Sequence, residues 1–258
     1  MSLLVIAEPK APRAGFGKIV HNEARLAWRQ PSGIIVSVGL SLLLLIIFGE
    51  LPAFQVSSAR LGGLSAFEIY IPILIAFVIG VLALTYLPGP LVSYREQGIL
   101  RRLSTTPVPV PWVLGAQLAV QACLMVITVA ILVVVSVVFF GAGAPKNTGG
   151  LVLTVTLSIA AMFAIGLAIA AGARTAGAAR GIMMATFYPL MFFSGLYIPM
   201  QLLPGVLQGI SHVTPLGAAV EAIQDSMLQG FPPIAPLLVL VAYAVVFGFL
   251  AKRFFRWE

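Results

Sequence analysis

The sequence predicts an all-α integral membrane protein with six transmembrane helices. The 258-residue chain is 60% hydrophobic and only 9% charged, with a mean hydropathy of +1.07. Soluble domains are roughly 45–50% apolar and about 25% charged, so this chain lacks the polar surface of a soluble enzyme or a disordered protein. Its apolar runs are long and unbroken, without the alternation of a membrane β-barrel.

Six segments have the roughly 20 mostly apolar residues that a membrane-spanning helix needs. They are residues 33–54, 68–92, 112–140, 151–173, 181–199 and 233–251. The third is long enough to tilt, and the fifth is short and contains Pro189. We expect residues 1–258 to form a single transmembrane domain without an internal repeat.

The positive charges predict the orientation of these spans. With six spans both termini share a side, and all but two of the 15 Lys and Arg residues fall on that side. The exceptions are Arg60 and Lys146. Because cytoplasmic loops carry the excess of Lys and Arg, both termini are predicted to be cytoplasmic. The net charge of +7 is thereby explained without a nucleic-acid partner.

Residues 15–30 precede the first span and are amphipathic. Lys18, Asn22, Arg25 and Arg29 share one helical stripe, and apolar residues such as Phe16 and Val20 share the opposite one. This pattern fits a helix that lies in the cytoplasmic interface, or a simple basic membrane anchor. Either interpretation places the segment in contact with membrane lipids.

The loop after the second span predicts a short cytoplasmic helix over residues 93–104. Ser93 and Glu96 have capping-box spacing, and Pro107 prevents its continuation. An apolar edge that arginines surround is formed by Ile99, Leu100 and Leu103. Such a helix suits docking into a groove on a partner, but an ordinary positive-inside loop would have the same charges.

The segment 200–232 predicts one or two short helices that dip back into the outer leaflet. Thr214 and Pro215 resemble an N-cap followed by proline at the first helical position. Glu221 and Asp225 then share one face at a spacing of i, i+4. This face is either solvated or an acidic gate at the outer exit of a pathway.

The fifth span is rich in aromatic and sulfur-containing side chains, which can adapt to varied apolar ligands. Packing against other helices or lipid explains the same composition. The candidate substrate-path residues are Phe187, Met191, Phe192, Phe193 and Tyr197.

The sequence shows no catalytic, cofactor or metal site. Residues 141–147 lack the Gly-Lys-Ser/Thr ending of a phosphate loop. The predicted topology separates the two histidines, and the chain has one cysteine, so no metal cluster can assemble. Ser194 lacks the surroundings of a hydrolase nucleophile, which argues against a pair with His212. Spans two to six have no acidic residue near the midplane, which argues against ion coupling.

Two stretches resemble the permease subunits of type-2 ABC exporters, the daunorubicin and polysaccharide export class. One follows the second span and reads Arg95-Glu96-Gln97-Gly98, then Leu100-Arg101-Arg102-Leu103 and Thr106-Pro107. The other contains Tyr188-Pro189-Leu190, Phe193-Ser194-Gly195 and Thr214-Pro215-Leu216. With the six-span plan, the resemblance covers essentially the whole chain.

The resemblance implies partners and roles for these segments. Two permeases, the same chain twice or a paralogue pair, would form a dimer served by two copies of a cytoplasmic ATPase that binds ATP and Mg. Residues 15–30 would be a connecting helix and 200–232 outer re-entrant helices. The pathway would lie between the second and fifth spans. The ATPase-coupling residues would be Arg95, Glu96, Gln97, Gly98, Leu100, Arg101, Arg102 and Leu103.

We therefore expect a non-catalytic permease subunit in a bacterial plasma membrane. Its expected cargo is a drug-like, antibiotic-like or other amphipathic molecule that is exported. Lipid or polysaccharide export by the same family is the alternative, and an ATPase-independent carrier is the alternative from another class.

Overall fold

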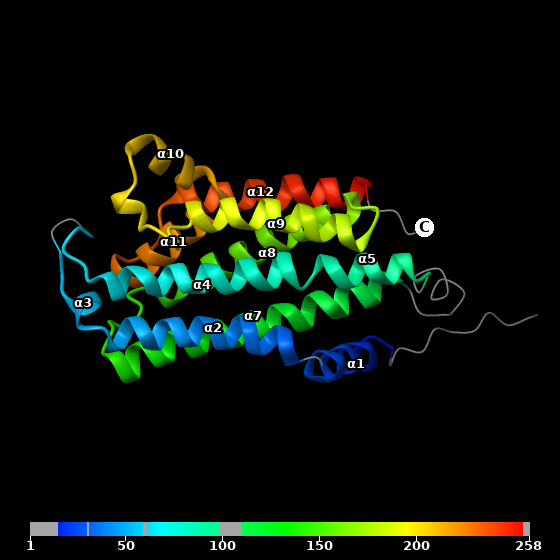
Figure 1. Cartoon of the computed structure of the whole chain (residues 1–258), viewed down its shortest axis with the longest axis horizontal. Helices are drawn as coiled ribbons and strands as arrows, with labels where there is room; N and C mark the ends of the chain where they lie inside the picture. Colours follow the sequence, from blue (N-terminus) through cyan, green and yellow to red (C-terminus); the bar gives the residue numbers. More distant parts are fainter. Residues whose placement is uncertain (1–14, 30, 59–60, 99–109, 255–258) are drawn as a thin grey trace, which may run out of the picture.

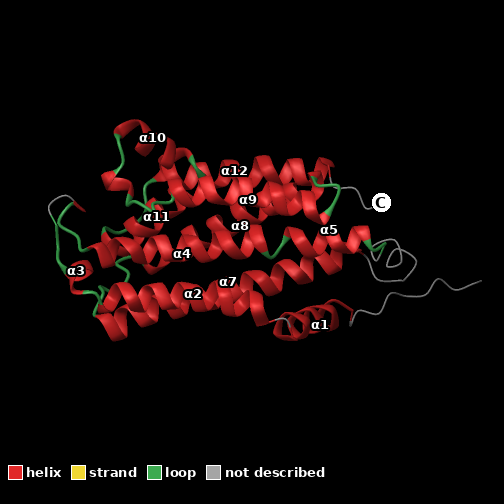
Figure 2. Cartoon of the chain, viewed as in Figure 1, coloured by secondary structure: helices red, strands yellow, loops and turns green. Residues whose placement is uncertain are grey.

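The computed structural model describes residues 15–29, 31–58, 61–98 and 110–254. Regular structure within these residues is helical, apart from one isolated bridge between Ser57 and Ser65 (Figure 2). The long helices run side by side along the longest axis of the molecule (Figure 1). The prediction of an all-α protein is confirmed.

The described helices range from a single turn to 31 residues. In chain order they are α1 (Gly15–Arg29), α2 (Pro31–Glu50), α3 (Pro52–Gln55), α4 (Ala66–Thr85), α5 (Pro88–Glu96), α7 (Val110–Phe140), α8 (Thr148–Gly172), α9 (Ala176–Phe193), the 3-10 helix η2 (Met200–Leu202), α10 (Gly205–Val213), α11 (Pro215–Leu228) and α12 (Ile234–Phe254).

Helix α4 is the centre of the bundle. All its residues from Ile71 to Leu84 are buried, and it packs against α2, α7, α8, α9 and α11. A helix that is apolar on all sides is stable only when other helices surround it. A capping box begins α4: the Ser65 hydroxyl accepts a hydrogen bond from the Glu68 backbone N–H, and the Glu68 carboxylate accepts one from the Ser65 backbone N–H.

Helices α7 and α12 lie at the outside of the bundle and leave apolar side chains uncovered. Phe139 on α7 is 75% exposed, and Phe249 on α12 is 66% exposed. Apolar faces of this extent are stable when lipid or another protein covers them.

Four stretches of the described residues are long and apolar enough to cross a membrane. They are Ala66–Glu96, Trp112–Phe140, Thr148–Gly172 and Ile234–Phe254. These correspond to the second, third, fourth and sixth predicted spans. The first and fifth correspond to α2 and α9, and their crossing of the membrane stays a prediction.

Three predicted spans differ from the helices observed. The first, predicted over 33–54, ends at Glu50, because Pro52 begins the separate short helix α3. The second is interrupted at Tyr86 and Leu87, because Pro88 begins α5 and cannot donate the backbone hydrogen bond that would continue α4. The fifth begins earlier and ends at Phe193 instead of residue 199. Gly195 has a φ of 88°, a left-handed conformation that ends the helix.

Candidate functional site

The end of α5 lies against the connection between α8 and α9. Ser93 and Glu96 belong to the last turn of α5, so their capping-box spacing does not begin a new helix as the sequence predicted. The reason is that Pro88 has already started the helix upstream. Gly98 has a φ of 65° just after the end of α5, and residues 99–104 of the predicted coupling helix lie outside the described residues.

Arg95 binds the carboxyl end of α8. Its guanidinium donates hydrogen bonds to the carbonyl oxygens of Ala170, at 3.5 Å, and of Ala173. The last carbonyl groups of a helix have no partner within the helix and carry partial negative charge. The Arg95 cation therefore ties α5 to the end of α8.

Glu96 binds the amino end of α9. Its Oε1 accepts a hydrogen bond of 3.0 Å from the backbone N–H of Ala176, the first residue of that helix. A carboxylate is favoured at this end, where free N–H groups carry partial positive charge. Arg95 and Glu96 thus connect α5 to both helices that meet at one turn, and we name this pair the α5 clamp.

The predicted ATPase-coupling residues fall into two groups. Arg95 and Glu96 make contacts within the chain, and Gln97 follows them with an exposed side chain. The second group, Leu100, Arg101, Arg102 and Leu103, lies outside the described residues together with Pro107. Docking of an ATPase at this loop stays a prediction.

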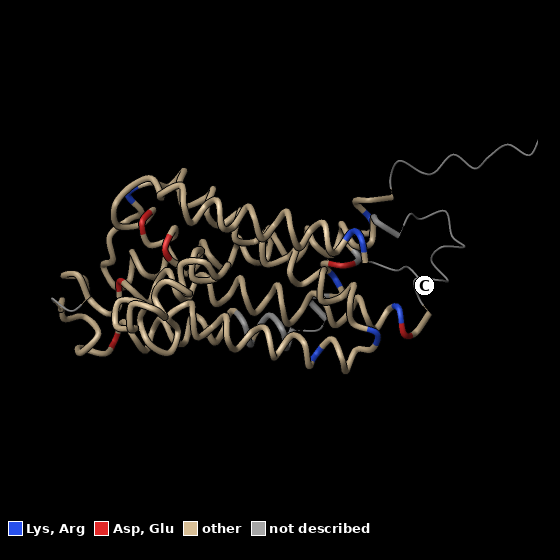
Figure 3. The backbone as a smooth tube through the Cα atoms, turned by 90° about the horizontal axis from the view of Figure 1, so that it is seen from above, with Lys and Arg blue, Asp and Glu red and all other residues tan. Residues whose placement is uncertain are grey.

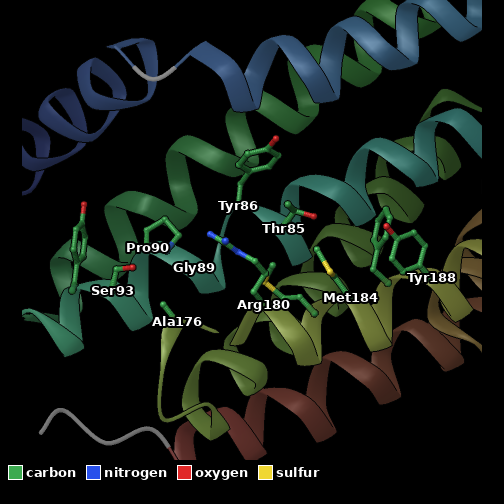
Figure 4. A pocket seen from close by; sticks show the side chains of 12 residues that line it. Thr85, Tyr86, Gly89, Pro90, Ser93, Ala176, Arg180, Met184 and Tyr188 are labelled. Carbon is green, nitrogen blue, oxygen red and sulfur yellow. The ribbon is translucent and has the colours of Figure 1, made fainter. Parts of the chain in front are cut away.

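A cavity of about 640 Å³ lies between the α4–α5 junction and α9 (Figure 4). We name it the α4–α9 cavity. From α4, the junction and α5 it is lined by Thr85, Tyr86, Gly89, Pro90, Ser93 and Tyr94. From α9 it is lined by Ala176, Arg180, Met183, Met184, Phe187 and Tyr188.

The structure separates the predicted substrate-path residues. Phe187 lines the cavity, whereas Met191 is fully buried and reaches the backbone of α4 at Gly80. Phe192 and Phe193 are half-buried, and their rings meet edge to face with centroids 5.3 Å apart. Tyr197 is exposed beyond the end of α9. Of the five, only Phe187 is part of the α4–α9 cavity.

Sequence reasoning missed most of this cavity. The charge pattern identifies Arg180 only as one of the Lys and Arg residues predicted on the cytoplasmic side, and no sequence pattern distinguishes Tyr86 or Tyr94. The available signal was the sequence Pro88-Gly89-Pro90 inside an apolar run, with a tyrosine on each side. Such a break marks a place where a membrane helix bends and lines a cavity or packs against protein.

A second, polar pocket of about 190 Å³ lies between η2, α10 and α11. His212 Nδ1 on α10 is 2.5 Å from Glu221 Oε2 on α11. The Gln201 side-chain nitrogen Nε2 donates a hydrogen bond of 3.5 Å to Gln224 Oε1. Burial raises the pKa of Asp225, and the negative charge of Glu221 raises it further. The acidic face predicted from the sequence is therefore half-buried and paired with a histidine, and a role as an outer gate stays a prediction.

The structure gives the rejected Ser194–His212 pair no support. The Ser194 hydroxyl is buried and donates to the Met191 carbonyl oxygen at 2.8 Å, while His212 contacts Glu221. Within the part of the chain that the structure describes, no three His, Cys, Asp or Glu residues form a group that could hold a metal ion.

The described charges divide between the two ends of the bundle. Lys and Arg gather at the end where α1, α5 and the end of α12 lie, and acidic residues gather mainly at the opposite end (Figure 3). The α5 clamp and Arg180 belong to the basic end, because the α8–α9 turn is there. The polar pocket belongs to the other end.

Comparison with known proteins identifies the family. The model of a family described as ABC-2 type transporter matches residues 15–228, a range that runs from α1 to α11. A search of curated proteins finds no significant match. The matched range includes the α5 clamp, the α4–α9 cavity, the polar pocket and three of the four stretches that are long and apolar enough to cross a membrane. The chain belongs to the ABC-2 type transporter family, as a multi-pass membrane component of the permease type.

Proposed function

We propose that the chain is the permease subunit of an ATP-driven exporter, which moves an amphipathic molecule out across the plasma membrane with a separate cytoplasmic ATPase. One observation carries the proposal. The end of α5 is bonded to both sides of the α8–α9 turn, and α9 forms one wall of a drug-sized cavity. A force applied at the loop after α5 would therefore reach the cavity directly.

The mechanism follows from that connection. ATP binding closes the two ATPase subunits, which press on the loop that contains Leu100, Arg101, Arg102 and Leu103. Arg95 and Glu96 pass this movement to α8 and α9, and the two permeases of a dimer rock from inward-facing to outward-facing. The chain performs no catalysis; it binds the cargo differently in two conformations, which makes the conformational change productive.

The charge distribution supports this direction of transport. Under the positive-inside rule the basic end is cytoplasmic, so both termini and the α4–α9 cavity are on the cytoplasmic side. The cavity would then receive cargo from the cytoplasm or the inner leaflet. The half-buried segment of η2, α10 and α11 would be on the outer side.

The cavity also favours a class of cargo. Its volume of about 640 Å³ is within the range of small-molecule sites, and aromatic and methionine side chains form much of its wall. These features favour a drug-like or antibiotic-like amphiphile. Lipid or polysaccharide export is the alternative within the family.

Purification of the tagged chain from its native membrane in nanodiscs, followed by mass spectrometry, tests the proposal. We expect a stoichiometric ABC ATPase and a second permease, either the same chain or a paralogue. Arg101→Ala with Arg102→Ala should reduce recovery of the ATPase. Arg174→Ala is the control: it removes a charge from the α8–α9 turn and should leave recovery of the ATPase unchanged.

The absence of an ATPase, also after crosslinking, would contradict the proposal. Transport by the purified chain in liposomes without ATP would then favour an ATPase-independent carrier. Equal recovery of the ATPase with both sets of variants would show that the loop after α5 is not its docking site.

A further inference from the structure

We propose that the α4–α9 cavity binds an amphipathic anion, with its acidic group at Arg180 and its apolar body along α9. This assigns a chemical class to the cargo. Its meaning for transport rests on the proposed function, whereas the binding itself can be measured on the chain alone.

The charge of the cavity is the first argument. Arg180 extends from α9 across the cavity toward the α4–α5 junction (Figure 4). None of the described lining residues is acidic, and Arg180 forms no ion pair with a described carboxylate. A guanidinium that faces a cavity without a carboxylate offers a forked set of donors to an anionic group.

Hydroxyl groups near the junction add donors. Thr85 ends α4, and Ser93 is one turn from the end of α5. Both line the same cavity as Arg180. A carboxylate, sulfonate or phosphate has several acceptor oxygens, so it can accept from the guanidinium and a hydroxyl together.

The spacing along α9 is the second argument. Arg180, Met183, Met184, Phe187 and Tyr188 follow one another at i, i+3, i+4, i+7 and i+8, and all five line the cavity. These positions form one stripe of a helix. The cation is at one end of the stripe, and the apolar and aromatic side chains extend about 12 Å beyond it along the helix axis, at ~1.5 Å per residue.

A simple orientation signal would explain the charge of Arg180 but not its place in the cavity. Arg174 provides the comparison within the chain, because it lies in the turn before α9, is exposed as Arg180 is, and does not line the cavity. If Arg180 acts only through the positive-inside rule, the two arginines should be equivalent.

Two probes with the same fluorophore and opposite charge test the proposal. Dansylglycine is an anion at neutral pH, and dansylethylenediamine is a cation. Their fluorescence is measured with the full chain in nanodiscs of zwitterionic lipid, and the signal from empty nanodiscs is subtracted. We expect saturable binding of dansylglycine and weaker binding of dansylethylenediamine.

Substitutions then assign the site. Arg180→Gln should weaken dansylglycine binding by about tenfold or more, as expected for loss of a charge-assisted hydrogen bond. Arg180→Lys should retain part of the affinity, and Arg174→Gln should retain all of it. Equal binding of both probes, or equal losses with Arg174→Gln and Arg180→Gln, would overturn the proposal.

A steric variant tests the location without changing any charge. A Cβ at Gly89 meets open space inside the cavity, so Gly89→Leu should fill part of it and weaken dansylglycine binding. Gly172→Leu is the control, because its Cβ also meets open space and it lines a different, apolar pocket. Unchanged binding with Gly89→Leu would place the probe elsewhere and overturn the proposal.

The experiments distinguish failure of the anion site from failure of the exporter proposal. Charge-selective binding that depends on Arg180 supports the anion site even if no ATPase is recovered with the chain. Recovery of an ATPase without charge-selective binding leaves the exporter proposal intact and removes the anion site.

Discussion

Arg95 and Glu96 of the α5 clamp belong to a motif that predicts contact with an ATPase, yet in the structure they contact helices of their own chain. The resemblance to exporter permeases assigns Arg95 and Glu96 to contact with an ATPase. In the structure both side chains bind helix ends of their own chain, and each charge has the sign that stabilises that end. We therefore interpret Arg95 and Glu96 as positioning residues that connect the end of α5 to α8 and α9.

Substitution of Glu96 tests this interpretation. Glu96→Ala removes the acceptor at the start of α9 and should lower the stability of the purified chain by about 1 kcal/mol, the usual cost of losing a capping interaction. Glu96→Gln keeps an acceptor oxygen and should lower it less. Thermal unfolding in detergent measures the effect.

Gln97→Ala is the matched control for this prediction, because Gln97 is the next residue and its side chain is exposed. Equal unfolding temperatures for Glu96→Ala and Gln97→Ala would show that the hydrogen bond to Ala176 does not contribute to stability. Loss of ATPase recovery without loss of stability would return Glu96 to the docking surface.

Single helices were predictable where one local signal decides their ends. Thr214 caps α11 and Pro215 is its first residue, as the sequence indicates, because both effects depend on neighbouring residues alone. The interruption of the second span was missed, since Pro88-Gly89-Pro90 lies within an apolar run that is otherwise long enough to span. The cavity beside it was also missed, because α9 approaches the junction only in three dimensions.

The close contact between α4 and α8 was equally invisible in the sequence. The small residues of the fourth span at a spacing of four permit close helix packing but do not identify the partner helix; they are Ala160, Ala164, Ala168 and Gly172. Gly166, which is outside this row, does approach α4 closely, because a Cβ there would lie 2.5 Å from the carbonyl oxygen of Ala83. Which glycine faces a neighbour depends on the rotation of the helix, and the spacing does not fix that rotation.

Alanine at two glycines of α8 separates these cases. Gly166→Ala should destabilise the chain by about 1–3 kcal/mol, because a backbone carbonyl blocks the added methyl group and the helices must move apart. Gly172→Ala meets no atom within 4 Å and should be neutral or stabilising, since alanine favours helix more than glycine does. Unfolding temperatures in detergent compare the two variants, and equal values would show that α4 and α8 are not in close contact at Gly166.

At the scale of the whole molecule, the cavity that contains an arginine lies near the basic end of the bundle, and the pocket that contains carboxylates lies toward the acidic end. Arg180 and the α4–α9 cavity are near the basic end, and the pocket with Glu221 and Asp225 is toward the other end. An anion bound at Arg180 would approach carboxylates as it moves along the bundle, so the field of the protein opposes its passage. This field raises the barrier to outward passage, and in the proposed function the movement of α9 that the ATPase drives would lower that barrier.

The orientation of the chain and the crossing of α9 can be tested together by cysteine labelling. Cys123 is the only cysteine and is exposed on α7, so Cys123→Ala provides the background. Single cysteines then replace Lys146 before α8, Arg174 after α8, and Gly209 on α10, all of which are exposed. Because α8 separates the first two positions and α9 separates the last two, they report on successive crossings.

We expect a membrane-impermeant maleimide to label Lys146→Cys and Gly209→Cys in intact cells, and Arg174→Cys only after the membrane is opened. The physical reason is the excess of Lys and Arg at the end that contains the α8–α9 turn. The opposite labelling at all three positions would invert the orientation and place the α4–α9 cavity on the outer side. Protection of Gly209→Cys together with labelling of Lys146→Cys would show that α9 does not cross, so that the six-span prediction fails at its fifth span.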